Sequence, residues 1–311
     1  MIRKILEKFS LYLALGGVIA AFSVASPYFL TSSNAMNIGT QSAIISIVAV
    51  GQTFVILTAG IDLSVGSVVA ASSILLGLLL ANGSPIGIGL LAALAMGAGL
   101  GLGNGAAVGA GRLPPFIVTL GTMSAARGLA LAMNGGRPVS GAYFPERFPE
   151  LVTSRIGGVP VLIFYAVVVY LVAYFVLTKW KFGRYVYALG GNREAARLSG
   201  IRTMRCEILV YTIGGFLAGL AGFLLTARLN YATPIAGTFY ELDSIAATVI
   251  GGTSLSGGEG SIIGTAVGAL LLGVLRNGLT LLNVNPYYQQ IIIGLVIVLA
   301  VFVDKLKVRV S

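Results

Sequence analysis

The densest group of ionisable side chains in this chain is a polar, basic segment, Thr178–Glu207, which separates two long apolar runs. In a membrane protein, short loops rich in Lys and Arg stay in the cytoplasm. The segment is therefore expected on the cytoplasmic side. Its basic residues are Lys179, Lys181, Arg184, Arg193, Arg197, Arg202 and Arg205.

The same segment contains the signal for one short helix. Asn192 is a suitable N-cap for a helix over Arg193–Ser199, and Gly200 is a suitable C′ residue. A helix of under two turns is not stable alone in water, so it must lie against another surface. Because Ala195 and Ala196 are small, a partner can approach this helix closely. A cytoplasmic partner is the expected occupant.

Asp62 is the most conspicuous acid near an apolar region, within the run GIDLSVGS at Gly60–Ser67. An ionised Asp at the bilayer centre costs about 2.5–3.5 kcal/mol, so such a residue usually has a partner or a role. Asp62 can cap the helix that follows, which stabilises a helix by roughly 0.5–2 kcal/mol. It can also form part of a gate or translocation pathway with Ser64 and Gly66. Both roles remain open.

Several kinds of chemistry are excluded by composition. The chain has no histidine, and its single cysteine, Cys206, begins an apolar run. A Cys/His zinc site, an intramolecular disulfide and histidine acid–base catalysis are therefore ruled out. No Gly-Lys pair occurs, so no phosphate-binding P-loop is present. We expect no cofactor and no enzymatic activity, with any ATP bound by a partner.

The composition is that of a membrane protein. Hydrophobic residues make up 57% of the 311, charged residues 10%, and mean hydropathy is +0.95. A soluble domain of this size would expose too much apolar surface. The net charge of +10 is explained by basic residues at loop ends rather than by nucleic-acid binding. Arg127 and Arg276 lie inside apolar runs, where they are expected to snorkel or to pair internally.

Apolar runs near 20 residues predict an all-α polytopic protein with about ten transmembrane helices, forming one permease domain over residues 1–311. Alternation from a cytoplasmic N-terminus places the C-terminus and the segment 178–207 inside and the long loop 134–158 outside. Breaks near Gly60 and Gly251 suggest interrupted or re-entrant spans. The predicted spans are 11–25, 41–58, 68–81, 86–110, 116–133, 159–177, 208–227, 244–250, 262–282 and 291–303.

Three stretches resemble one known family. They are RYVYALGGNREAARLSGI (Arg184–Ile201), TFVILTAGIDLSVGS (Thr53–Ser67) and ELDSIAATVIGGTSLSGGEGSIIGT (Glu241–Thr265). The first contains the E-A-A-x-x-x-G pattern that begins at Glu194. The chain resembles permease subunits of ATP-binding-cassette importers, in the ribose/xylose/galactose branch and closest to its ribose-type members. The resemblance covers nearly the whole chain.

The resemblance implies a short cytoplasmic helix that docks into a groove on an ATPase subunit with two domains. It also implies a sugar-binding protein outside the membrane, a second permease copy forming a homodimer, and a location in the bacterial cytoplasmic (inner) membrane. The sugar passes between the two copies, with the Gly-rich run 86–110 and the GIDLSVGS run as candidate linings. The implied coupling residues are Gly190, Gly191, Asn192, Glu194, Ala195, Ala196, Arg197 and Gly200.

A secondary transporter driven by an ion gradient is the alternative. Such a protein typically shows paired intramembrane acids or unwound carbonyl sites for H⁺ or Na⁺. Asp62 alone is weak support, and the short cytoplasmic helix would then have no purpose. Which sugar is carried does not follow from the residues.

Overall fold

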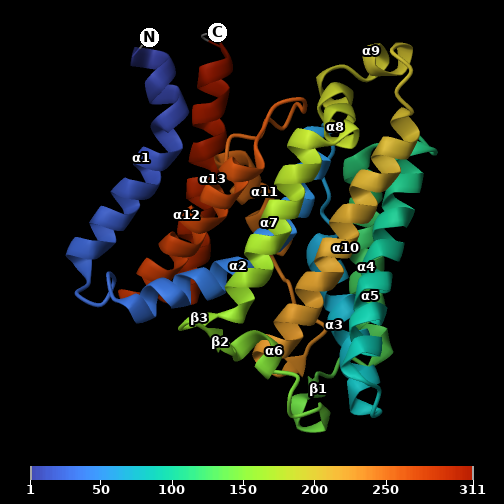
Figure 1. Cartoon of the computed structure of the whole chain (residues 1–311), viewed down its shortest axis with the longest axis vertical. Helices are drawn as coiled ribbons and strands as arrows, with labels where there is room; N and C mark the ends of the chain where they lie inside the picture. The colour runs from blue at the N-terminus through green and yellow to red at the C-terminus, as the bar shows by residue number, and fades with distance from the viewer. Residues whose placement is uncertain (1, 310–311) are drawn as a thin grey trace.

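The computed structural model describes residues 2–309, with side chains described for residues 11–296 and for Val298. This part of the chain forms a helical bundle with short strands at one end (Figure 1). The long helices are α1 (Ile2–Ala25), α2 (Ser32–Leu57), α3 (Val65–Ala81), α4 (Ile86–Gly109), α5 (Pro115–Met133), α7 (Val161–Lys179), α10 (Thr203–Leu229), α12 (Ile262–Leu281) and α13 (Pro286–Arg309). The shorter elements are β1 (Val139–Ser140), η1 (Gly141–Tyr143), α6 (Glu150–Thr153), β2 (Arg155–Ile156), β3 (Val159–Pro160), α8 (Lys181–Gly191), α9 (Arg193–Leu198), β4 (Tyr231–Ala232) and α11 (Tyr240–Ile250).

The helices α2 and α10 form the centre of the bundle, whereas α4, α5 and α7 are peripheral. The peripheral helices expose large apolar side chains, such as Leu91, Leu171 and Phe175, which are 68%, 61% and 58% exposed. Within the described residues, six helices are long and apolar enough to cross a membrane, namely α2, α4, α5, α7, α10 and α12. Apolar side chains on the outside of such helices suit lipid rather than water. The chain is a multi-pass α-helical membrane protein.

A row of glycines lets α4 pack directly on α10. A side chain at Gly97 would lie 2.8 Å from the backbone nitrogen of Gly219, and one at Gly105 would lie 2.6 Å from the Cα atom of Ile208. Small residues allow this approach where packing replaces the hydrophobic effect. These glycines, on the face of α4 that α10 covers, serve helix packing. Gly87, Gly99 and Gly103 of the run 86–110 lie on exposed parts of α4, and a pathway role for this run stays a prediction.

Two crossings of the bundle are interrupted by non-helical chain. After α2, a turn at residues 58–59 and irregular chain at residues 60–64 lead into α3, which continues to the end that carries the strands (Figure 1). After α10 and β4, the turns of residues 234–239 lead into α11, which continues in the opposite direction (Figure 1). The two interruptions are thus inverted relative to each other. The interruption predicted near Gly60 is confirmed, but the second one lies before α11 rather than at Gly251.

The number of complete crossings differs from a simple count of apolar runs. The helix α11 has 11 residues, which gives a length of about 16 Å, roughly half of the hydrocarbon thickness. It therefore spans only part of the membrane, and the turns of residues 234–239 lie before it. The predicted count of about ten transmembrane helices, with both termini cytoplasmic, stays a prediction.

The two ends of the bundle are different. One end carries α8 and α9, and the first turn of α1 and the last turn of α13 lie at the same end (Figure 1). The other end carries both sheets. There β1 pairs antiparallel with β4 through Val139 and Ala232, and β2 pairs with β3 through Ile156 and Val159.

Two segments that the sequence suggested were polar loops are largely helical. The connection expected over residues 28–40 becomes α2 from Ser32, because the Thr31 hydroxyl accepts a hydrogen bond from the backbone N–H of Asn34 at 3.3 Å. Such an N-cap satisfies a donor that a helix start leaves free. The basic segment 178–207 contains α8 as well as the predicted short helix. Its amphipathic sequence buries Val186 and Leu189 against the bundle.

Candidate functional site

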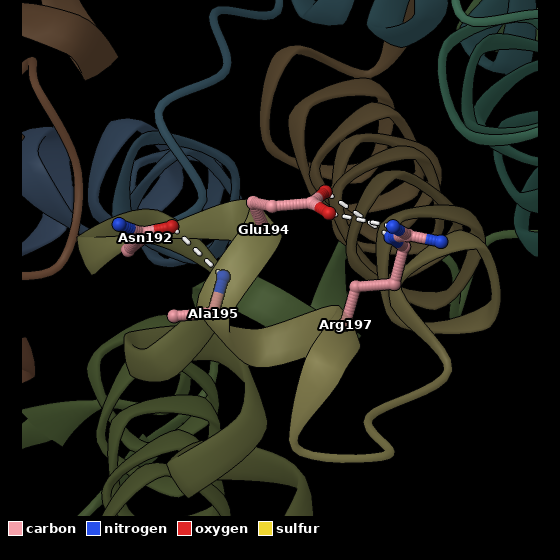
Figure 2. A network of polar contacts seen from close by, with 4 residues as sticks. All are labelled: Asn192, Glu194, Ala195 and Arg197. Atoms are coloured by element: carbon pink, nitrogen blue, oxygen red, sulfur yellow. Dashed lines mark hydrogen bonds and ion pairs between the residues drawn. The ribbon is translucent and has the colours of Figure 1, made fainter.

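The short helix α9 is capped at both ends by the residues that the sequence suggested. The Asn192 side chain accepts a hydrogen bond from the backbone N–H of Ala195 at 2.9 Å (Figure 2). At the other end, Gly200 has a φ of +82°, which favours glycine. Its N–H donates to the backbone carbonyl of Arg197 at 3.0 Å, and the N–H of Ile201 donates to the backbone carbonyl of Ala196 at 3.1 Å. These two bonds form a Schellman motif.

The outer surface of α9 is open to solvent. Glu194 and Arg197 form an ion pair with oxygen–nitrogen distances of 2.5 and 3.1 Å (Figure 2), and their side chains are 64% and 62% exposed. Hydrogen bonds from Arg197 hold the pKa of Glu194 below its usual value. Leu198 is 75% exposed, whereas Ala196 is buried toward the protein. The helix therefore presents an apolar tip beside a paired acid and base.

α9 is tied to the bundle by an ion pair and by the preceding helix. Arg193 donates to Glu207 at the start of α10, with a nitrogen–oxygen distance of 2.9 Å. In α8, the Tyr187 hydroxyl donates to the carbonyl of Gly260 at 3.0 Å. Phe182 of α8 stacks on Phe54 of α2, with ring centroids 6.3 Å apart. The α8–α9 unit is thus held against α2 and against the loop after α11.

Gly190 makes the closest of these contacts. A side chain at Gly190 would lie 2.5 Å from the backbone nitrogen of Gly258 and still closer to the carbonyl oxygen of Leu57. That nitrogen donates to that oxygen at 3.0 Å. Gly257 packs on Ala59 in the same place. We call this contact between Leu57–Ala59, Gly190–Gly191 and Gly257–Gly258 the glycine junction.

Asp62 lies in the irregular segment that leaves the glycine junction, and it is fully buried. Its carboxylate accepts hydrogen bonds from the backbone N–H of Ser64 at 2.8 Å and from the Ser64 hydroxyl at 2.6 Å. Asn104 of α4 donates to the Ser64 hydroxyl at 2.9 Å, and Thr122 of α5 donates to Asn104 at 2.5 Å. The Gln52 amide pairs with the backbone N–H and carbonyl of Asp62, each at 3.2 Å.

This network explains how irregular backbone exists inside the bundle. A backbone group left unpaired in a lipid environment costs several kcal/mol, so irregular backbone must be satisfied by the protein. Asp62 binds the backbone and side chain of Ser64 just before α3. The N-cap residue of α3 is Ser64 and not Asp62. Sequence reasoning identified Asp62 and Ser64 but missed their partners Gln52, Asn104 and Thr122. These three are single polar residues in apolar runs, which was the available signal.

Gly66 lies where the two interrupted crossings meet. A side chain there would collide with the carbonyl of Gly237 and with the carboxylate of Glu241. The first turns of α3 and α11 therefore face each other across a backbone contact. Gly66 is buried by this contact, and Asp62 and Ser64 are each 1% exposed. A pathway role for these three residues stays a prediction.

Two arginines hold the second interruption. Arg127 of α5 donates to the carbonyls of Pro234 and Ala236 at 2.6 and 3.0 Å. Arg276 of α12 donates to both carboxylate oxygens of Asp243 at 3.0 and 2.9 Å. The prediction that these arginines pair internally is confirmed. Within the described residues, no group of three His, Cys, Asp or Glu side chains is placed to hold a metal ion.

The coupling residues suggested by the sequence thus lie together at one end of the bundle. The glycine junction brings Gly190 and Gly191 against the start of the segment that carries Asp62. The exposed residues of α9 lie in the outer part of the α8–α9 end, and Asp62, Ser64 and Gly66 lie in the interior. The loop 251–261 was missed as part of this site, although its glycines were conspicuous.

Known proteins resemble this chain over nearly its whole length. Residues 34–301 match the family described as branched-chain amino acid transport system / permease component. The chain is 42% identical to the ribose import permease protein of Bacillus subtilis over 97% of its own length and 94% of that protein. It is 46% identical to the ribose import permease protein of Escherichia coli, over 95% of this chain and 92% of that one. The D-allose transport system permease protein of Escherichia coli is 39% identical over 96% of this chain and 92% of that protein.

No solved structure shows significant similarity to the chain. The family is nevertheless established by a match over most of the chain and by relatives that align nearly end to end. The chain belongs to the family of branched-chain amino acid transport system / permease components.

Proposed function

We propose that this chain is the membrane-spanning permease subunit of an ATP-binding-cassette importer that carries a small, ribose-like sugar. The observation that carries the proposal is α9, a capped helix of six residues whose outer face is exposed. A helix this short is not stable alone, and here it is fixed by Arg193 and by the glycine junction. Its exposed tip is suited to a protein partner that must move the permease. The names of the relatives support a sugar as cargo.

The proposed topology places the α8–α9 end in the cytoplasm of a bacterium and the sheets outside the cytoplasmic (inner) membrane. The basic residues around α8 and α9 support this orientation through the positive-inside rule. The termini lie at the same end as α9 (Figure 1), so they too would be cytoplasmic. The loop 134–158 would then face the sugar-binding protein.

The proposed assembly contains two permease copies and two ATPase domains, with an external binding protein that delivers the sugar. ATP binds to the ATPase partner, and the permease needs no cofactor. A closed two-fold dimer is the commonest oligomer, and it doubles the number of α9 helices to match two ATPase domains. The sugar would cross between the copies.

Reconstituted transport tests this function. The permease, an ATPase subunit and a binding protein from the same gene cluster are placed in proteoliposomes with D-ribose, D-allose or D-fructose. We expect uptake of at least one sugar that requires both ATP and the binding protein. Uptake by the permease alone, driven by an ion gradient, would instead show a secondary transporter and would refute the proposal.

Cysteine labelling tests the orientation. In a variant that lacks Cys206, Ala142→Cys should react with an impermeant thiol reagent added outside intact cells. Arg197→Cys should react only after the membrane is opened. Both positions are exposed in the structure, so a difference reports sidedness and not burial. The reverse pattern would place α9 outside and would contradict docking to an ATPase.

A further inference from the structure

A cavity of about 360 Å³ lies between the start of α11, the second half of α12 and the start of α13. Its volume falls at the lower end of the range of ligand pockets, roughly 300–1,000 Å³. The turn between α12 and α13 lies at the end of the bundle away from α9 (Figure 1). The residues that matter here are Phe239, Asp243, Arg276, Gln289 and Gln290, all of which line the cavity.

We propose that this cavity receives a neutral monosaccharide on the extracytoplasmic side of the membrane. The proposal rests on the proposed function, because it names the place in the permease where the imported sugar first binds. Three features of the cavity support this assignment, namely its charge, its hydrogen-bonding groups and one strained aromatic residue.

The charge of the cavity suits a neutral ligand. Asp243 is 5% exposed, and both of its carboxylate oxygens accept from Arg276 at 2.9 and 3.0 Å. The pair presents one negative and one positive charge that satisfy each other. Because these charges cancel, the lining gives a charged ligand no net attraction, and a cation that displaced Arg276 would have to break a bidentate pair with a buried carboxylate. A neutral polyol does not require that exchange.

The lining offers both donors and acceptors. The guanidinium of Arg276 has five N–H donors, of which the side chain of Asp243 uses only part, and its side chain is 38% exposed. Gln289 is 8% exposed, and its amide nitrogen is held by Thr280 and Val284 at 3.2 and 2.9 Å. Neighbouring hydroxyl groups on a sugar ring both donate and accept. They match a carboxylate–guanidinium pair flanked by amides.

Phe239 adds an apolar surface in a strained conformation. Its φ is +69°, in the left-handed region that a bulky residue rarely adopts. The side chain is nevertheless 46% exposed and lines the cavity. Strain of this kind persists where the surroundings impose it and is concentrated at functional sites. A flat aromatic ring beside hydrogen-bonding groups suits the C–H face of a sugar ring.

The strain at Phe239 follows from the meeting of the two interrupted crossings. Gly237, two residues earlier, packs against Gly66 and has a φ of +66°. Arg127 holds the carbonyls of Pro234 and Ala236 on the other side. The chain is thus fixed just before Phe239, and α11 begins just after it. The position of the Phe239 Cα atom at the cavity is therefore set by the contact at Gly66.

Protection of a cysteine tests binding directly. Gln290→Cys in the Cys206-free permease, with ATPase subunit and in lipid nanodiscs, should react with an impermeant thiol reagent. The sugar that the reconstituted importer transports, at tens of millimolar, should slow that reaction several-fold, whereas an equal concentration of sucrose should not. Ala142→Cys at the same end is the control and should be unaffected. Equal rates with and without the sugar would overturn the proposal. So would an unreactive Gln290→Cys, since lipid or a second copy would then fill the cavity.

Transport by ring variants provides the second test. Phe239→Tyr keeps the flat ring, and Phe239→Leu keeps apolar volume and the same backbone strain without the ring. We expect Phe239→Leu to lower the sugar imported per ATP hydrolysed by roughly 2- to 12-fold, the factor that corresponds to an ordinary aromatic contact. Phe239→Tyr should transport as the unsubstituted protein does. Equal transport by both variants would refute the sugar site and leave the proposed function standing. Absence of sugar uptake by the unsubstituted importer would instead refute the proposed function.

Discussion

Gly190→Ala should separate docking of the ATPase from transport. An added Cβ atom would lie 2.5 Å from the nitrogen of Gly258, whereas ordinary contacts begin at 3.4 Å. The two backbones must therefore move apart by about 0.9 Å or more. Overpacking of a tight contact typically costs 1–3 kcal/mol. The bond from Gly258 to Leu57 at 3.0 Å, worth about 0.5–1.5 kcal/mol, lies in the same place.

A cost of about 1–3 kcal/mol lowers, by a factor of roughly 5 to 150, the ratio of molecules in which the glycine junction is packed to molecules in which it has separated. The caps of α9 at Asn192 and Gly200 do not involve Gly190, so α9 itself should stay folded. We therefore expect the ATPase subunit to co-purify with Gly190→Ala while the sugar transported per ATP falls several-fold.

The matched control is the next residue. A side chain at Gly191 would meet nothing within 4 Å, so Gly191→Ala makes the same chemical change at the end of the same helix without a collision. It should transport normally. Both variants are assayed in proteoliposomes for ATP hydrolysis and sugar uptake, with protein level checked by gel filtration. If Gly190→Ala transports as well as Gly191→Ala does, the glycine junction does not link α9 to the bundle.

Three further predictions concern single positions. Gly97→Ala should lower the thermal stability of the purified permease by roughly 1–3 kcal/mol, because a Cβ atom there collides with α10, whereas Gly99→Ala, with open space around it, should not. Gly200→Ala should weaken ATPase co-purification, because alanine at a φ of +82° costs about 1–2 kcal/mol and frays the end of α9. Normal co-purification would contradict this. Arg197 lowers the pKa of Glu194. The stability that this ion pair gives to α9 is therefore fully present above the usual carboxyl pKa, and it is lost as the pH falls through the lowered pKa of Glu194. Co-purification should therefore be constant from about pH 6 to pH 8, and a loss within that range would count against the pair.

Local signals in the sequence were sufficient for much of the architecture. The apolar runs correspond to helices at nearly every predicted position, because hydrophobic length is set by the membrane and is read directly from composition. The caps of α9 were predictable for a similar reason. Asn192 and Gly200 act through bonds to residues within a few positions, so their roles do not depend on the rest of the fold.

What could not be predicted depends on contacts between distant segments. In the polar stretch after α10, Pro234, Ala236 and Gly237 are buried, and Arg127, from another helix, binds the carbonyls of Pro234 and Ala236. The helix α8 was hidden in a basic segment, because its apolar residues are spaced for one buried face and do not form a continuous run. Gly190 was assigned to coupling by resemblance alone. Its contact with Leu57 has no trace in the local sequence.

The interruptions explain how events at the two ends of the bundle are physically connected. A continuous helix could not bring backbone atoms of Leu57 against the α8–α9 unit and, a few residues later, bring Gly66 against Gly237. The non-helical chain over residues 58–64 does so, because it leaves the carbonyl of Leu57 free to bond another segment. Both contacts bring backbone against backbone, and Glu241 adds a side-chain contact at Gly66. Packed interfaces of this kind shift between discrete arrangements rather than deform gradually. We therefore expect a displacement at the glycine junction to be felt at Gly66 and, through Gly237, at the neighbouring strained residue Phe239.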